Sequence, residues 1–83
     1  MQPVVYILRC ADGSLYTGWT VDLERRLREH RAARASKYTR SRLPVELARS
    51  FNVRSRTAAR RLEAKIKTLS RARKLRLLSG EIL

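Results

Sequence analysis

Cysteine and long apolar runs are scarce in this chain. Cys10 is the single cysteine, so no disulfide can form within the chain, and a metal cluster built on several thiolates is excluded. A lone cysteine at the end of a strand is more often a small packing residue than a nucleophile. The N-terminal apolar run spans about five residues, too short for the core of a signal peptide or for a membrane span. We therefore expect a cytoplasmic protein with no membrane segment and no disulfide-linked partner.

Acidic residues are also few. The 83 residues include seven Asp and Glu against 20 Lys and Arg, which gives a net charge of +13. Most of these cations are arginines, and arginine binds phosphate bidentately and stacks on bases, which lysine does less well. The balance favours a polyanionic partner, with nucleic acid as the first expectation. The alternative is a basic surface that serves only solubility.

The length predicts a single domain over residues 1–83, with room for a few helices against one small sheet. Strands are expected where β-branched and aromatic side chains gather, at residues 4–9, 15–19 and 45–51. Helices are expected after a capping residue, which is Thr20 or Asp22 for the first, Ser55 or Thr57 for the second and Ser70 for the last.

The first helix is expected to end at about Arg31 and the last one before Gly80, while residues 32–44 are interpreted as a polar, basic connection. The order of elements is then ββαβαα. It predicts an α+β fold, in which a small three-stranded antiparallel sheet is flanked by helices.

The turn between the first two strands decides where Tyr6 and Tyr16 lie. If residues 11–13 form a three-residue loop with its glycine in the left-handed region, Cys10 pairs with Ser14. The two tyrosines then share a face of the sheet as diagonal neighbours. A two-residue Asp-Gly turn would place them on opposite faces. The first register makes a polar site, whereas the second makes two packing tyrosines.

Arg26 and His30 interrupt the apolar face of the first helix. They follow Leu23 by three and seven positions, so they lie on the same side of the helix as that leucine and point toward the sheet. Each has an ordinary alternative. Arg26 can extend between the leucines to water, and His30 can stabilise the C-terminal end of the helix dipole.

Glu63 lies beside the apolar stripe of the second long helix and is the only acidic residue between Phe51 and Ser79. One carboxylate can hold a Mg²⁺ ion whose other positions are filled by water. The alternative is an ion pair with Arg60 or Lys67, one turn away. A proton acceptor, a cation for the developing charge and a metal ligand together suit hydrolysis of a phosphodiester. The candidate catalytic residues are Tyr6, Tyr16, Arg26, His30 and Glu63.

The spacing of these residues resembles that of the GIY-YIG nuclease superfamily. VYI at residues 5–7 stands where that family has GIY, and YTG at residues 16–18 stands where it has YIG. Arg26 follows Tyr16 by ten positions, His30 by four more, and Glu63 lies in ARRLEAKIK on the next long helix. More closely, the chain from Val4 to about Lys74 looks like the small, stand-alone bacterial branch of the superfamily. It departs from the family pattern at Val5, at Trp19 and in having no evident asparagine after Glu63.

The resemblance implies an endonuclease that cleaves DNA with one divalent cation, Mg²⁺ or Mn²⁺, in DNA repair or processing. By analogy, Tyr6 or Tyr16, helped by His30, would activate or orient the attacking water. Arg26 would neutralise the scissile phosphate, and Glu63 would hold the metal. Nothing in the sequence resembles a base-reading element, so we expect recognition of backbone or structure.

The basic segment after the first helix is the candidate nucleic-acid surface. It would follow the phosphate backbone if it borders the cleft, and the alternative is a solvated loop with its tyrosine packed on the sheet. Two other functions stay open: a nucleic-acid-binding module with little or no cleavage, and a non-enzymatic protein that binds an acidic protein surface. The sequence does not separate DNA from RNA and predicts no oligomeric state. The candidate binding residues are Arg34, Lys37, Tyr38, Arg40 and Arg42.

Overall fold

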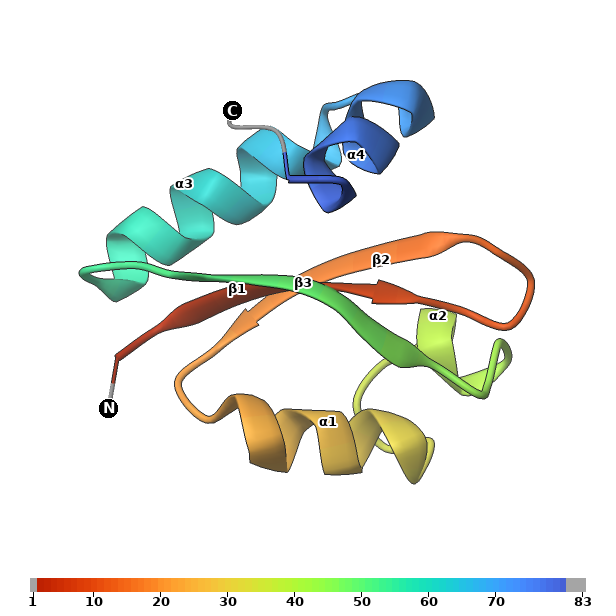
Figure 1. Cartoon of the computed structure of the whole chain (residues 1–83). Helices are drawn as coiled ribbons and strands as arrows, with labels where there is room; N and C mark the ends of the chain where they lie inside the picture. The colour runs from red at the N-terminus through yellow and green to blue at the C-terminus, as the bar shows by residue number, and fades with distance from the viewer. Residues whose placement is uncertain (1, 81–83) are drawn as a thin grey trace.

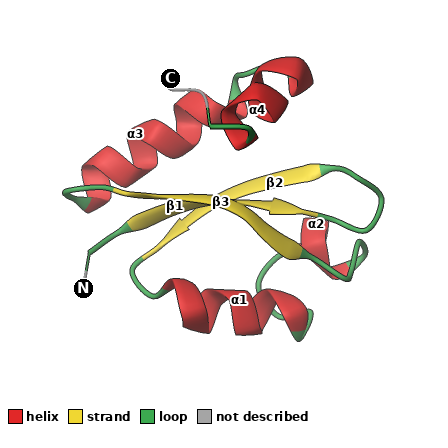
Figure 2. Ribbon diagram, viewed as in Figure 1, coloured by secondary structure: helices red, strands yellow, loops and turns green. Residues whose placement is uncertain are grey.

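A computed structural model describes residues 2–80. Three antiparallel strands form one sheet in the order β2-β1-β3, so β2 and β3 are its edges. Helices α1 and α2 lie on one face of this sheet, and α3 and α4 lie on the other (Figures 1 and 2). The predicted α+β fold is confirmed. The elements are β1 (Val4–Arg9), β2 (Leu15–Thr20), α1 (Leu23–Arg31), α2 (Lys37–Arg40), β3 (Glu46–Asn52), α3 (Arg56–Lys67) and α4 (Arg71–Leu78).

The β1–β2 hairpin has the three-residue loop. The backbone N–H of Cys10 donates to the carbonyl oxygen of Ser14 at 2.9 Å, and Gly13 has a φ of +82°. A positive φ at this position is what a three-residue hairpin loop requires, and glycine adopts it without strain. Tyr6 is paired with Gly18, and the residue that pairs with Tyr16 is Leu8. The two tyrosines are therefore diagonal neighbours on one face.

The three longer helices begin directly after a side-chain cap that the sequence predicts. The carboxylate of Asp22 accepts from the N–H of Arg25 at 3.1 Å, which selects Asp22 over Thr20 for α1. The hydroxyl of Ser55 plays the same part for α3, and that of Ser70 for α4. Such caps satisfy one of the N–H groups that a helix leaves unpaired at its start.

Alternating side chains of β1 build a core on each face of the sheet. Val5 and Ile7 point toward α3 and α4, where they pack with a cluster that includes Ala59, Ile66 and Leu77. Tyr6, Leu8, Cys10 and Val45 form the core on the α1 face, with Leu23, Leu27 and Leu43 against it. The burial of Cys10 agrees with its interpretation as a packing residue.

The segment 32–44 differs from the sequence-based expectation, because it contains the short helix α2. Its cap is Ser36, whose hydroxyl accepts from the N–H of Tyr38 at 3.1 Å. Four residues give no apolar periodicity, so the pattern could not indicate this helix. The order of elements gains one helix between the first helix and the third strand. Within residues 2–80, no helix has the length and apolar character that crossing a membrane requires.

Candidate active site

The centre of the candidate site is a hydrogen bond between Tyr6 on β1 and His30 in the last turn of α1. The hydroxyl of Tyr6 lies 2.8 Å from Nε2 of His30, and the ring planes meet at 72°. The two side chains are 2% and 1% exposed. His30 therefore points inward, as the helical spacing predicts, and its place near the C-terminus of α1 does not leave it on the surface.

The other nitrogen of His30 has its own partner on α2. Nδ1 lies 2.9 Å from Oγ1 of Thr39, a residue that is 1% exposed. The Thr39 hydroxyl in turn donates to the carbonyl oxygen of Ser36 at 3.4 Å. Sequence reasoning missed Thr39, because the only available signal was a hydroxyl residue between basic residues in a segment interpreted as a loop.

Tyr16 extends this buried pair toward the surface. Its ring centroid lies 5.2 Å from that of His30 and 6.4 Å from that of Tyr6. On the outer side it stacks on Tyr38, with centroids 6.0 Å apart and planes inclined by 29°. Tyr38 is 37% exposed, and the guanidinium of Arg42 lies 3.9 Å above its ring. A row of four neighbouring rings therefore runs from the core to the surface: Tyr6, His30, Tyr16 and Tyr38.

Gly18 makes room for the two tyrosines. A Cβ atom at this position would lie 2.7 Å from the hydroxyl oxygen of Tyr6 and 3.2 Å from Cε2 of Tyr16. The first distance is shorter than any tolerated carbon–oxygen contact, and the Tyr6 side chain is buried and cannot move away. The glycine of YTG is therefore required by close packing against the tyrosine of the neighbouring strand.

Arg26 lies on α1 one turn before His30. Its side chain is 38% exposed, and Nε lies 3.4 Å from Oε1 of Glu29 without forming a hydrogen bond. Within residues 2–80 this buried Nε has no hydrogen-bond partner. The positive charge of Arg26 acts on both buried groups, since it lowers the pKa of His30 and opposes the rise in the pKa of Tyr6. The arginine is half-exposed beside the site, so it can reach a bound anion.

Glu63 lies on α3, which packs against β2 on the other face of the sheet. Its carboxylate is 22% exposed and lies 3.7 Å from Nζ of Lys67, which is the ordinary ion pair considered from the sequence. Its charge is one of the smaller causes of the raised pKa of Tyr6. Because β2 is an edge strand, groups from α1 and α3 can meet beside it.

Burial sets the protonation of the central pair. Removal from water is the largest cause of the raised pKa of Tyr6, and Tyr16 raises it further. Burial is also the first cause of the lowered pKa of His30; Arg26 adds to it and Glu29 opposes it. At neutral pH the phenol therefore keeps its proton and the imidazole is uncharged. A neutral imidazole can accept a proton.

The residues around Glu63 fit a cation that keeps most of its waters. Among residues 2–80, no three His, Cys, Asp or Glu side chains gather into a metal-binding group. A partly exposed single carboxylate suits Mg²⁺, which dehydrates reluctantly and is commonly held by one or two carboxylates together with substrate phosphates. It does not suit an ion that needs an all-protein cage.

The candidate nucleic-acid residues divide into two groups. Arg34, Lys37 and Arg40 line one hollow beside α2. Arg42 is instead engaged within the chain, because its Nε donates to Oδ2 of Asp12 at 3.1 Å and its Nη1 donates to the carbonyl oxygen of Tyr38 at 2.9 Å. Arg42 therefore ties the hairpin loop to α2 and supports Tyr38.

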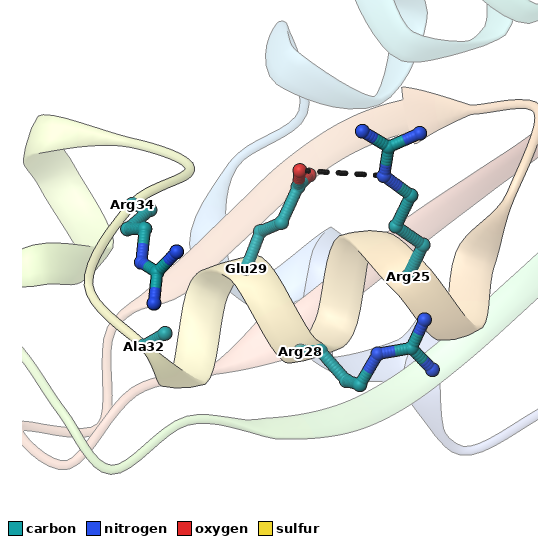
Figure 3. Close-up of a pocket in the computed structure, with 5 residues that line it drawn as sticks. All are labelled: Arg25, Arg28, Glu29, Ala32 and Arg34. Carbon is teal, nitrogen blue, oxygen red and sulfur yellow. Dashed lines mark ion pairs between the residues drawn. The ribbon is translucent and has the colours of Figure 1, made fainter.

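A second hollow lies on the outer surface of α1 and also includes Arg34. Figure 3 shows its lining, in which the Arg25 guanidinium turns toward the Glu29 carboxylate at 3.6 Å. Arg34 thus borders both hollows and joins the α1 surface to the α2 segment. Trp19, by contrast, packs in the core of the opposite face, with the guanidinium of Arg60 5.7 Å above its ring. The hollow of Figure 3 is lined by Arg25, Arg28, Glu29, Ala32 and Arg34.

Comparison with known proteins identifies the family of the chain. The GIY-YIG catalytic domain matches residues 2–76. A UPF0213 protein of Natronomonas pharaonis is 52% identical over 77 residues, which cover 93% of this chain and 91% of the relative. A UPF0213 protein of Syntrophus aciditrophicus is 51% identical over 75 residues, covering 89% of this chain and 86% of that relative.

A solution NMR structure of a UPF0213 protein from Bacillus halodurans has a TM-score of 0.63 at 44% identity, covering 95% of this chain and 84% of that one. A second NMR structure, of a protein from E. faecalis, has a TM-score of 0.65 at 35% identity over 100% of this chain and 92% of its own. Since the domain match spans nearly the whole sequence and these relatives are of similar length, the chain belongs to the GIY-YIG nuclease family, and its close relatives are small UPF0213 proteins.

Proposed function

We propose that this protein is an endonuclease that hydrolyses phosphodiester bonds of DNA with the help of one divalent cation, in DNA repair or processing. The observation that carries the proposal is the buried hydrogen bond between Tyr6 and His30; the charges of Arg26 and Glu63 both act on the pKa of Tyr6, in opposite directions. The rings of Tyr6 and His30 pack in the core of the α1 face, but packing alone does not require a phenol bonded to an imidazole. Such a pair has a clear use where a proton must be moved.

The hydrogen bonds around His30 define the direction in which a proton can move. The Thr39 hydroxyl has one proton, and in the proposed arrangement that proton is donated to the carbonyl oxygen of Ser36. Its oxygen then accepts from Nδ1–H of His30. This leaves Nε2 of His30 without a proton, as the acceptor of the Tyr6 hydroxyl. Thr39 is thus a positioning residue that selects the tautomer of His30.

In this arrangement Tyr6 acts as the proton acceptor for the attacking water. Its oxygen takes a proton from the water while its own proton passes to Nε2 of His30, so no phenolate has to exist in a buried place. The raised pKa of Tyr6 makes this coupling necessary, because the free phenolate is strongly disfavoured there. His30 becomes an imidazolium whose Nδ1–H is still held by Thr39.

Arg26 and Tyr16 act on the substrate. Arg26 is half-exposed beside the site and supplies the positive charge for the phosphate oxygens as negative charge develops on them. Tyr16 meets His30 edge-on and stacks on Tyr38, and the two contacts fix its ring. A fixed phenol hydroxyl can orient either the water or the phosphate by a hydrogen bond.

Glu63 would hold the divalent cation, Mg²⁺ or Mn²⁺. When bound, such a cation polarises the phosphate and stabilises the leaving oxygen. The carboxylate must exchange its contact with Lys67 for the cation, and that exchange is easy because a partly exposed pair of this kind contributes little. Lys67 would then be free to contact the substrate backbone.

The substrate class follows from charge. The net charge of +13 and the exposed cations beside α2 suit a polyanion, and Arg34, Lys37, Tyr38, Arg40 and Arg42 are the proposed backbone contacts on this side. Arg42 contributes by holding Tyr38 in place. We propose DNA rather than RNA because the resemblance is to DNA-cleaving proteins.

A cleavage panel tests the proposal. Single-stranded, duplex, flapped and four-way-junction DNA, with a single-stranded RNA alongside, are incubated with wild type in Mg²⁺, in Mn²⁺ and in chelator. We expect cleavage that requires the cation and that Glu63→Ala abolishes. Glu46→Ala is the matched control, because Glu46 is an exposed carboxylate on the opposite edge strand, β3.

The outcomes separate the candidate functions. Cleavage that persists in Glu63→Ala contradicts the assigned site. Salt-sensitive binding of DNA without cleavage of any substrate would favour the nucleic-acid-binding module. Cleavage restricted to the RNA would correct the substrate while leaving the site intact.

A further inference from the structure

The net charge is divided unevenly along the chain. Residues 2–52 contain ten Lys and Arg with five Asp and Glu, whereas residues 53–80 contain ten Lys and Arg with only one acid, Glu63. The second group belongs mainly to α3 and α4, which lie together on one face of the sheet (Figure 1). We call six exposed cations of these helices the basic helical layer: Arg56, Arg61, Lys65, Arg71, Arg73 and Arg76.

Helix stability does not explain this distribution. In α1, Glu24 pairs with Arg28 and Arg25 pairs with Glu29, each across one turn, and Glu24 also lies in the first turn. These placements stabilise a helix. Among the residues of α3 and α4 that the structure describes, ion pairs across one turn are almost absent. Such a pair joins Lys67 to Glu63.

The basic helical layer is in fact arranged against helix stability. The first turns of α3 and α4 contain no acidic residue but do contain Arg56 and Arg71, where the helix dipole favours negative charge. Arg61 and Lys65 are like charges four positions apart on an exposed surface, which is also unfavourable. A bound polyanion would offset both unfavourable terms, because its negative charges would lie beside the helix N-termini and between the like-charged side chains.

One end of this layer borders the candidate site. Arg56 lies seven positions before Glu63, so it is on the same side of α3 as the proposed metal ligand, together with Arg60 and Lys67. Arg61 and Lys65 are each two positions from Glu63 and lie on the other side of the helix. At the other end, Nη2 of Arg71 lies 3.9 Å from where a Cβ of Gly13 would be, beside the hairpin loop. Backbone that reaches Glu63 can therefore continue over α3 and α4.

We propose that the basic helical layer is a second nucleic-acid-binding surface, which holds the phosphate backbone of duplex DNA next to the site of cleavage. The inference rests on the proposed function for its substrate class. It assigns to α3 and α4 the backbone contacts that the sequence placed only in the segment before β3. The longest dimension of the molecule is 31 Å, a length equal to about nine base pairs of duplex.

The test is the salt dependence of binding, measured in chelator so that no cleavage occurs. A labelled duplex of about 20 base pairs is titrated with wild type and with Arg61→Gln/Lys65→Gln/Arg73→Gln at several salt concentrations. Each phosphate contact contributes about 0.9 to the slope of log K against log salt. We expect the triple variant to bind more weakly and its slope to be smaller by about 2 to 3.

A control with the same change of net charge keeps the test specific. Arg9→Gln/Arg25→Gln/Arg28→Gln also removes three exposed cations, but these are paired with Glu46, Glu29 and Glu24. We expect its slope to stay within about one of wild type. Equal losses in the two triple variants, or a wild type that does not bind the duplex, would overturn the proposal.

A single substitution separates binding from folding. Arg61→Glu places an acid four positions before Lys65, the favourable order for an ion pair on a helix. We expect its Tm to rise while its affinity for the duplex falls. A fall in both would show that Arg61 serves the fold. Loss of cleavage in the panel with an intact salt slope would overturn the proposed function and leave this surface standing.

Discussion

The hydroxyl of Tyr6 and Nε2 of His30 lie 2.8 Å apart in a part of the core where both side chains are shielded from water. The two residues are 24 positions apart in the chain and come from different elements, a strand and a helix. A buried phenol needs a hydrogen-bond partner, and here the partner is the one side chain that can also accept its proton near neutral pH. The core of the α1 face is thereby also the candidate site.

Without the Thr39 hydroxyl, His30 should no longer be held in a single tautomer. In Thr39→Val, Nδ1–H loses its acceptor, so the variant should be less stable by about 1–3 kcal/mol and should show a mixture of tautomers. The two ring nitrogens have distinct ¹⁵N chemical shifts in each tautomer, and His30 is the only histidine in the chain. An NMR spectrum of the free protein therefore measures the effect without any assay of cleavage.

Thr39→Ser is the control, since it keeps the hydroxyl. It should keep the Nδ1–H tautomer and most of the cleavage rate, whereas Thr39→Val should lose about tenfold or more. If wild type itself shows the Nε2–H tautomer, Tyr6 is the acceptor of that hydrogen bond and the proposed direction of proton transfer is wrong.

The pKa of His30 should determine how the cleavage rate depends on pH. Burial and Arg26 lower this pKa below its usual value of 6.5, so cleavage should persist to a lower pH than a surface histidine would allow. Glu29→Gln removes the charge that opposes the shift and should lower the pKa further. An NMR titration of the His30 ring checks both statements. A pKa at or above 6.5 in wild type would contradict them.

The same shift affects folding. Because the folded pKa of His30 lies below the unfolded one, the unfolded chain binds more protons as the pH falls below about 6.5, and the free energy of unfolding decreases. The decrease ends once the pH has passed the folded pKa. Urea unfolding of wild type and of His30→Gln at a series of pH values should show that this part of the decrease is missing in the variant.

Gly18→Ala should damage the site through packing alone. The added Cβ would lie 2.7 Å from the Tyr6 hydroxyl oxygen and 2.8 Å from Cζ. Overpacking of this kind costs about 1–3 kcal/mol, and here it must also displace Tyr6 from His30. We expect lower stability by urea unfolding and loss of cleavage.

A double variant tests the cause. Tyr6→Leu removes both the hydroxyl oxygen and Cζ, so in Tyr6→Leu/Gly18→Ala the second change should be less harmful than in wild type, with a coupling of at least about 0.5 kcal/mol. Strict additivity of the two single effects would mean that the glycine is required for another reason.

Local sequence rules predict much of this fold. The Asp-Gly turn, the alternation in β1 and the capping residues Asp22, Ser55 and Ser70 each act over a few neighbouring positions, and the structure confirms them. The boundaries shift only slightly, since β2 extends to Thr20 and β3 runs over Glu46–Asn52 rather than residues 45–51.

The parts that sequence could not predict depend on contacts between distant segments. Thr39 meets His30 only because α2 folds back under α1, and α2 is too short to have a periodic pattern. The engagement of Arg42 with Asp12 likewise joins residues 30 positions apart. Glu63 is predicted from its place beside the apolar stripe of its helix and from the resemblance, but its position across the sheet from α1 follows only from the packing of α3 against β2.

The central claim is that Tyr6, through His30, accepts the proton of the attacking water. The direct measurement is the cation-dependent cleavage rate of Tyr6→Phe beside that of Tyr16→Phe, on whichever DNA wild type cleaves best. The proposed roles predict a loss of about 10²–10⁴ for Tyr6→Phe, the range that general acid–base catalysis contributes, and a smaller loss for Tyr16→Phe. A Tyr6→Phe variant that is folded and cleaves at the rate of wild type would contradict the claim.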